Sequence, residues 1–205
     1  MKTTTEIDPQ LVKQLREKTS AGFMDCKRAL AESAGDLEKA EAILRKKGIA
    51  TAGKKASRAT KEGIVASYIH LQGKVGVLVE VNCETDFVAR NEKFREFVKN
   101  ITLHIAAAHP LYVSRADVPG NLIEAEREIY KAQVKDKPQN VVNKIVEGKL
   151  DKFFSTVCLL EQAFIRNPDQ TIEDLLKSKI AELGENIIIR RFTRYLVGEP
   201  LSSEP

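Results

Sequence analysis

Residues 64–83 read IVASYIHLQGKVGVLVEVNC and contain two runs rich in β-branched side chains with a glycine between them. The second run alternates strictly, with apolar side chains at Val75, Val77, Val79 and Val81. Such alternation is typical of a strand with one buried face. The runs at 64–71 and 74–83, joined by Gln72 and Gly73, therefore predict a β-hairpin that covers a core.

A helical pattern follows this hairpin directly. Apolar residues recur every seven positions, with two more beside them on the same side, at Phe87, Phe94, Ile101, Ala108, Val98 and Ile105. The spacing predicts one amphipathic helix over residues 86–109, ended by Pro110 and lying across the hairpin.

The rest of the chain after residue 110 mixes helices with one further strand. Helical patterns occupy 121–135, 139–150 and 171–183, and residues 185–197 are rich in Ile, Arg, Phe and Tyr in the manner of a strand. Residues 153–165 are too apolar for a surface segment. Strands and helices do not alternate as in a doubly wound parallel sheet. The predicted class is α+β, with an antiparallel-sheet core domain packed with helices.

The first fifty residues predict three short helices. Asp8 before Pro9 is a favourable start for the first helix. Gly22 separates the first helix from the second, Gly35 separates the second from the third, and Gly48 follows the third. A module of this size has a small core, which suits a recognition head. The expected organisation is a head at 1–50, a basic linker helix at 51–63, an α+β core and dimerisation domain at 64–199 and a polar tail at 200–205.

The segment from residue 45 to residue 61 contains seven basic residues and no acidic one. A solvated connecting helix is the simpler interpretation, because charge runs commonly cover the surface. The alternative is an RNA- or ribosome-binding accessory protein that uses this segment together with Arg190, Arg191 and Arg194. No aromatic residue lies between Phe23 and Tyr68 to stack on bases. Phosphate binding would weaken steeply with added salt, which distinguishes the two interpretations.

The composition narrows the class of protein further. The chain has 205 residues, 42% of them hydrophobic, and a net charge of only +4, so it can bury a core and lacks the one-sided charge of a dedicated nucleic-acid binder. Its three cysteines are far apart, which argues against a disulfide framework or a cysteine zinc site and favours a reducing cytoplasm. We expect no signal peptide and no membrane span, since no apolar run is long enough.

Candidate catalytic residues are few. The sequence has no Walker loop, GxGxxG, HExxH or GxSxG motif. Glu84 and Asp86 could form a carboxylate pair, but acids beside a helix start are more simply partners of its dipole. Cys83 is best interpreted as a buried strand cysteine, and His104, between two apolar residues, as a hydrogen-bonded buried histidine. We therefore expect no enzyme activity, no catalytic residue, no metal and no cofactor.

The segment between the hairpin and the following helix stands out. Thr85 is a plausible N-cap, which places Asp86, Phe87 and Val88 in the first helical turn, at a strand-to-helix corner. Phe87 could complete the apolar stripe or stand exposed as an anchor for a partner. Spacing alone favours the core, because an apolar residue on a helical stripe is ordinarily packing.

These residues also resemble a known family. NCETDFVAR at 82–90 resembles the signature of the translation elongation factor Ts family, and LVKQLR at 11–16 with TSAGFMDCKRAL at 19–30 is similar to the family's head module. Further collinear similarities are GDLEKA at 35–40, LRKKG at 44–48, KP at 137–138, IVEGK at 145–149, LLEQAF at 159–164 and GENIIIRRF at 184–192. Together they extend over nearly the whole chain.

The resemblance implies a UBA-like head and a guanine-nucleotide exchange factor for elongation factor Tu, binding its GDP-bound and nucleotide-free forms. It assigns Mg²⁺ dislocation to the corner at Thr85, Asp86, Phe87 and Val88. Asp86 and Phe87 would enter the partner near its nucleotide, Thr85 would cap the turn and Val88 would support it. The resemblance thus reverses the expectation for Phe87, from buried to exposed.

The same resemblance implies further partner contacts and a stoichiometry. Arg16, Phe23 and Met24 would bind the nucleotide-binding domain of elongation factor Tu, although close relatives often have Met where this chain has Phe23. The chain resembles the short form of the family, so two copies are expected to act as a homodimer in a 2:2 complex. No direct nucleic-acid contact and no membrane are expected, and the expected location is the cytoplasm or an organellar matrix or stroma.

Overall fold

The computed structural model describes residues 7–19, 21–134 and 138–200. Ser20 and Lys137 of the family motifs and most of the tail expected at 200–205 lie outside the described residues. The chain forms two compact units. The first comprises the described residues up to Gly63 together with Asn82–Phe94 and Asp174–Ile188, and the second comprises Ile64–Val81, Arg95–Glu173 and the described residues from 189 onward.

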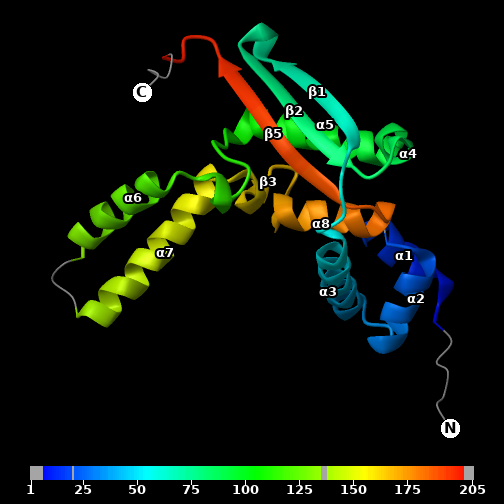
Figure 1. Ribbon diagram of the computed structural model, residues 1–205. Coiled ribbons are helices and arrows are strands. Elements are labelled where there is room, and N and C mark those ends of the chain that lie inside the picture. Colours follow the sequence, from blue (N-terminus) through cyan, green and yellow to red (C-terminus); the bar gives the residue numbers. More distant parts are fainter. Residues whose placement is uncertain (1–6, 20, 135–137, 201–205) are drawn as a thin grey trace. The chain divides into compact units, whose positions relative to one another are not determined.

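The first unit begins with a head of three helices, α1 (Pro9–Thr19), α2 (Phe23–Glu32) and α3 (Leu37–Lys55), as the sequence predicts (Figure 1). The Asp36 side chain caps α3 by accepting a hydrogen bond from the Lys39 amide at 3.0 Å. The three helices enclose a small apolar core of Val12, Leu15, Cys26, Ala29, Leu30, Ala40 and Leu44.

The third head helix is longer than predicted. It was expected to end at Gly48, with a separate linker helix after it, but α3 continues without a break to Lys55. One glycine inside a helix costs only about 1 kcal/mol, which tertiary packing can offset. Gly48 faces the helix α8 (Ile172–Leu183), where a Cβ at its position would lie 3.8 Å from the Ala181 methyl group.

The second unit contains most of a three-stranded sheet in the order β1 (Glu62–His70), β2 (Val75–Cys83), β5 (Ile187–Leu196). The predicted hairpin is confirmed, although its connection is the short helix η1 (Leu71–Gly73), whose three residues all have positive φ. The Val197 amide donates to the Lys74 carbonyl at 2.9 Å, which joins the end of β5 to the start of β2. The central strand buries the predicted valines, Val75, Val77, Val79 and Val81.

The helix predicted over residues 86–109 is in fact two helices, α4 (Asp86–Arg90) and α5 (Glu92–Ala108). Asn91 between them is extended, with φ −66° and ψ 133°, so the helical hydrogen bonding stops there. Figure 1 shows α5 behind the sheet, as expected. The Arg194 guanidinium on β5 donates to the Ala106 carbonyl on α5 at 3.4 Å. The fully buried side chains of α5 include Phe97, Val98, Ile101 and Ile105.

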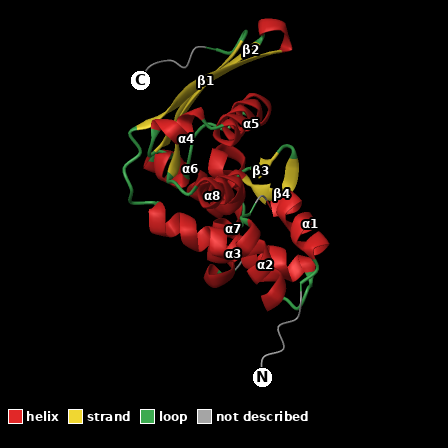
Figure 2. Ribbon diagram, turned by 90° about the vertical axis from the view of Figure 1, so that its right-hand side faces the viewer, coloured by secondary structure: helices red, strands yellow, loops and turns green. Residues whose placement is uncertain are grey.

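The remainder of the second unit is a helical hairpin (Figure 1) followed by a small strand pair (Figure 2). Its elements are η2 (Arg115–Asp117), α6 (Gly120–Ala132), α7 (Gln139–Val157), η3 (Leu159–Glu161), β3 (Ala163–Phe164) and β4 (Asn167–Thr171). The helix expected at 139–150 thus extends into the apolar segment, and the antiparallel pairing of β3 with β4 was not predicted. These findings confirm the α+β class.

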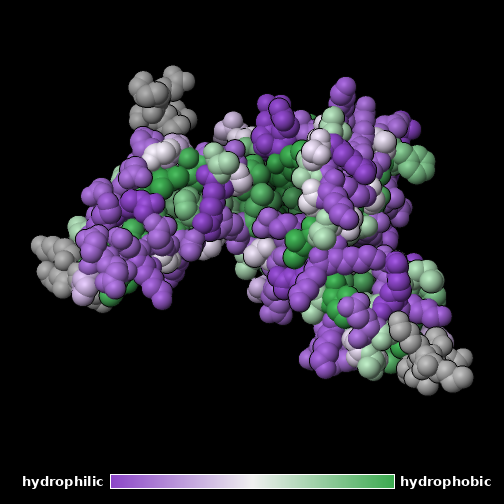
Figure 3. Space-filling view, turned by 60° about the horizontal axis from the view of Figure 1, so that its bottom comes forward, coloured by the Kyte–Doolittle hydropathy of each residue, from purple (hydrophilic) through white to green (hydrophobic). Residues whose placement is uncertain are grey.

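The surface is largely polar. On the face drawn in Figure 3, hydrophilic side chains predominate and hydrophobic ones are exposed in a few separate areas. Within the described part of the chain, no helix is both long and apolar enough to cross a lipid bilayer.

Candidate functional site

The strongest candidate site is the α4 corner, residues 85–88, in the first unit. Thr85 is extended at φ −127° and ψ 154°, and its hydroxyl accepts a hydrogen bond from the Val88 amide at 3.3 Å, as an N-cap does. Asp86 lies in the first helical turn and is paired with Arg90 at 2.8 Å. The predicted cap is therefore present.

The break at Asn91 determines the environment of Phe87. Because α4 ends at Arg90, Phe87 does not continue the buried stripe of α5, and it is 81% exposed whereas Phe94 is fully buried. Val88 and Ala89 are the buried residues of α4. The interpretation of Phe87 as core, which spacing alone favoured, is wrong. The corner is held by its neighbours and presents a phenyl ring to solvent.

The residues expected to bind a partner through the head are exposed as well. Gly22 precedes α2 in an extended conformation, and the next two residues, Phe23 and Met24, are 52% and 60% exposed. Arg16 is exposed on α1. The most exposed large apolar side chains of the first unit thus lie on α2 and α4.

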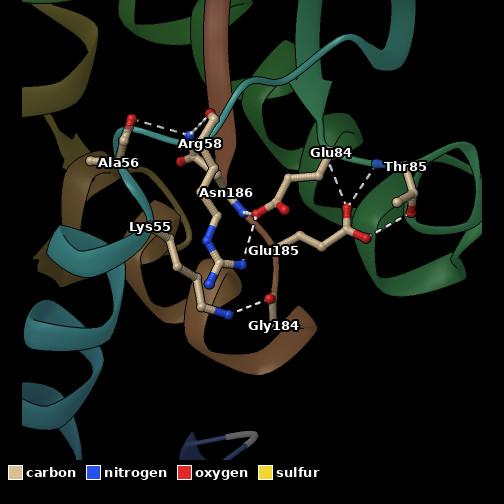
Figure 4. Close-up of polar contacts among 8 residues, drawn as sticks. All are labelled: Lys55, Ala56, Arg58, Glu84, Thr85, Gly184, Glu185 and Asn186. Atoms are coloured by element: carbon tan, nitrogen blue, oxygen red, sulfur yellow. Dashed lines mark hydrogen bonds and ion pairs between the residues drawn. The ribbon is translucent and has the colours of Figure 1, made fainter.

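A carboxylate from a distant part of the sequence contacts the α4 corner (Figure 4). Glu185 follows α8, and its Oε2 accepts hydrogen bonds from the amides of Glu84 and Thr85, both at 3.1 Å. Its Oε1 accepts a third bond from the Thr85 hydroxyl at 2.7 Å. One carboxylate therefore binds both residues that lead into α4.

The neighbours of Glu185 bind the end of the head in the same region (Figure 4). The Asn186 side chain donates hydrogen bonds to the carbonyls of Ala56 at 3.3 Å and Arg58 at 2.9 Å. The backbone amide of Asn186 donates to Glu84 Oε1 at 2.6 Å. Lys55 donates to the Gly184 carbonyl. Residues 184–186, hereafter the 184–186 turn, thus join the segment after α3 to the segment before α4.

The same contacts account for much of the basic segment at 45–61. Four of its seven basic side chains contact partners within the first unit: Arg45 with Asp174 at 2.6 Å, Arg58 with Glu84 at 3.5 Å, Lys47 with Asp25, and Lys55 with the Gly184 carbonyl. In the second unit, Arg191 pairs with Glu80 at 2.7 Å and Arg194 with Glu199 at 2.9 Å. These contacts give the positive charges a structural role and weaken the RNA-binding alternative.

The residues considered for catalysis, Cys83, Glu84 and Asp86, each contact a partner within the first unit. Burial and the Glu185 carboxylate raise the pKa of Cys83 to about 11, so its thiol is a poor nucleophile at neutral pH. Glu84 and Asp86 contact separate basic partners, Arg58 and Arg90. Among the described residues, no group of three or more His, Cys, Asp or Glu side chains could hold a metal ion.

His104 is a buried histidine, as predicted. The Ile165 amide donates to His104 Nδ1 at 3.4 Å, so Nε2 carries the proton and donates to Gln162 Oε1 at 2.9 Å. Burial lowers the pKa of His104, and the bond to Gln162 opposes this shift only in part. The imidazole is therefore neutral and internal to the second unit.

Sequence reasoning missed Glu185 and Asn186 as parts of the site. Both belong to the GENIIIRRF motif at 184–192, but Glu185 lies 100 residues from Thr85. The only available signal was two polar residues immediately before a strand that begins with buried Ile187. A pairing over this distance has no local pattern.

Comparison with known proteins identifies the family of the chain. The family model for elongation factor TS matches residues 10–199. Elongation factor Ts of Thermotoga petrophila is 58% identical over 194 residues, which cover 95% of this chain and 98% of the relative. Elongation factor Ts of Carboxydothermus hydrogenoformans is 60% identical over 200 residues, covering 97% of this chain and 92% of the relative. The chain therefore belongs to the elongation factor Ts family.

Proposed function

We propose that this chain promotes GDP release from elongation factor Tu by inserting its α4 corner beside the partner's nucleotide site. Membership of the elongation factor Ts family implies a role in nucleotide exchange on that partner during translation. The observation that supports the corner is the 81% exposure of Phe87. A large apolar side chain that remains in water on the free protein gains most when a partner buries it.

The proposed mechanism is a displacement at the partner's phosphate site. Phe87 would wedge between side chains of the partner, and Asp86 would enter beside it, so that the partner's contacts with Mg²⁺ and the GDP phosphates are lost. A bound Mg²⁺ is the largest local countercharge to the phosphates, so a small displacement there weakens GDP binding strongly. Thr85 caps the turn and buried Val88 supports it.

The thermodynamics of this proposal follow from linkage. A protein that binds nucleotide-free elongation factor Tu more tightly than the GDP-bound form must weaken GDP binding by the same factor. The chain itself hydrolyses nothing in this scheme, and its site of action is the compartment in which elongation factor Tu works, the cytoplasm or an organellar matrix or stroma.

The head supplies a second proposed contact. Exposed Arg16, Phe23 and Met24 would bind the nucleotide-binding domain of the partner. Aromatic residues, Met and Arg are enriched in protein–protein interfaces, which supports these three residues as contacts. In this scheme residues 1–50 form the head that binds the partner, residues 51–63 link it to the rest of the chain, and residues 64–199 form the core and dimerisation domain that also carries the corner.

Release of fluorescently labelled GDP from elongation factor Tu tests the corner. We expect Asp86→Ala and Phe87→Ala to slow release, by about 30-fold for Phe87, since loss of an interface hot spot costs about 2 kcal/mol. Ile129→Ala is the matched control, because Ile129 is 51% exposed on α6 and has no assigned role. If both corner variants release GDP as fast as the unmodified chain, the corner assignment is wrong although the family assignment remains.

We also propose that two copies of the chain act together in a 2:2 complex. The sheet face opposite the buried valines exposes Val65, Ile69 and Leu78, by 68%, 64% and 48%. Ile69 lies over Gly76, because a Cβ there would be 3.4 Å from its Cδ1. A second copy is an occupant that could cover these side chains. Light scattering that finds one copy per partner at about micromolar concentration, where specific dimers ordinarily persist, would contradict this stoichiometry.

A further inference from the structure

We infer that Glu185 is a positioning residue for the α4 corner, and that its carboxylate holds Phe87 in the orientation needed for exchange. The inference deepens the proposed function and rests on it, because it assigns to Glu185 a role in the same reaction. The Glu185 carboxylate contacts Glu84 and Thr85, the two residues that lead into α4 (Figure 4).

The contacts of Glu185 fix the backbone where α4 begins. An ionised carboxylate only accepts hydrogen bonds, and this one accepts three from two consecutive residues, Glu84 and Thr85, at 3.1, 3.1 and 2.7 Å. Charge-assisted bonds of this kind are roughly twice as strong as neutral ones. Two adjacent peptide groups are therefore held by a single side chain.

The third of these bonds connects Glu185 to the helix cap. The Thr85 hydroxyl donates its only proton to Glu185 and accepts from the Val88 amide at 3.3 Å. Glu185 thus orients the hydroxyl so that a lone pair faces the first turn of α4. The Glu185 carboxylate orients the Thr85 hydroxyl and that hydroxyl caps α4, so the direction of the Phe87 side chain depends on both contacts.

Glu185 is in turn fixed by the 184–186 turn. Gly184 has φ +78°, a conformation that favours glycine, and its carbonyl accepts from Lys55. The contacts are also reciprocal, since Glu84 Oε1 accepts from the Asn186 amide at 2.6 Å while Glu185 accepts from the Glu84 amide. Crossed contacts of this kind resist rotation of either segment.

The α4 corner depends on contacts from outside its own helix. The helix has five residues, too few to be stable by itself. Packing anchors only Val88 and Ala89, and Phe87 is 81% exposed. Without Glu185, Phe87 would sample several directions, and the fraction of molecules ready to insert would fall. The maximal rate of GDP release should then fall, while binding through the head is kept.

The test combines kinetics with a local probe of Phe87. The chain contains no tryptophan, so Phe87→Trp introduces a single tryptophan at the corner, which can be excited selectively at wavelengths where the four tyrosines do not absorb. We expect Glu185→Ala to lower the fluorescence anisotropy of this residue. In the chain with Phe87 intact, the same change should lower the maximal rate of GDP release about tenfold and alter the half-saturating concentration less than about twofold.

Two further variants separate positioning from folding. Glu185→Gln keeps the size of the side chain and an amide oxygen that can accept from the backbone, so both readouts should lie between those of Glu185→Ala and the unmodified chain. Asp174→Ala is the matched control: it removes a carboxylate contact of α8, to Arg45 at 2.6 Å, without touching the corner. It should leave the anisotropy and the rate unchanged.

The outcomes distinguish this inference from the proposed function. If Phe87→Ala slows release but Glu185→Ala neither slows it nor loosens the probe, the inference fails alone. If Glu185→Ala does not fold and Glu185→Gln equals the unmodified chain in both readouts, the role is structural and the inference is overturned. If Phe87→Ala releases GDP as fast as the unmodified chain, the proposed corner and the role of Glu185 both fail.

Discussion

Truncation of two phenylalanines seven residues apart should destabilise the fold to very different extents. Phe87 on α4 is 81% exposed, whereas Phe94 on α5 is fully buried, and both belong to the first unit. Folding therefore buries about a fifth of the Phe87 side chain. Complete burial of such a side chain stabilises the fold by about 2 kcal/mol, so Phe87→Ala should lower folding stability by only about 0.4 kcal/mol. For Phe94→Ala we expect a loss of about 3–5 kcal/mol, because the change also leaves a cavity.

Urea unfolding followed by far-ultraviolet circular dichroism measures both changes, since the chain has no tryptophan for fluorescence. Phe87→Ala should leave the unfolding midpoint close to that of the unmodified chain while it slows GDP release, whereas Phe94→Ala should lower the midpoint strongly. A loss of more than about 1.5 kcal/mol for Phe87→Ala would refute the reasoning, because it would mean that the ring packs against the core.

Three further predictions concern other parts of the chain. Burial opposes ionisation of Glu182, but hydrogen bonds from Lys179 at 2.7 Å and Lys93 at 2.5 Å prevail and lower its pKa below 4.5. Glu182→Gln should therefore lower the free energy of unfolding, measured in urea, by about 2 kcal/mol at neutral pH. The loss should become smaller as the pH falls through the lowered pKa, because the carboxylate is then protonated in the unmodified chain as well. Burial lowers the pKa of His104 below 6.5, its ordinary value. The contribution of His104 to folding stability should therefore be greatest above about pH 6.5 and fall as the pH drops towards the lowered pKa. His104→Gln should lose this difference when unfolding is compared at about pH 7.5 and about pH 5.5. Leu78→Glu, on the exposed sheet face, should shift the proposed dimer towards monomer in light scattering, because a buried unpaired carboxylate is unfavourable.

The positions of several elements follow from local patterns. The alternating valines of β2 predict their own burial, because side chains of a strand point in turn to opposite faces. The caps at Asp36 and Thr85 are likewise readable from residue type, since a short oxygen-bearing side chain can satisfy amides two or three residues ahead. The length of α3 and the β3–β4 pair were not predictable in this way, because packing decided them against or without a local signal.

The sequence by itself determined that the corner at 85–88 would form a capped helix start, and the family resemblance pointed to Phe87 as an exposed anchor. Only the tertiary structure decided how that corner is held. Periodicity placed Phe87 on the stripe of Phe94, but the extended Asn91 separates the two residues into different helices. Glu185 reaches the corner across 100 residues of chain. Hydrogen bonds between segments so far apart depend on the path of the whole chain, and therefore leave no periodic trace near either partner.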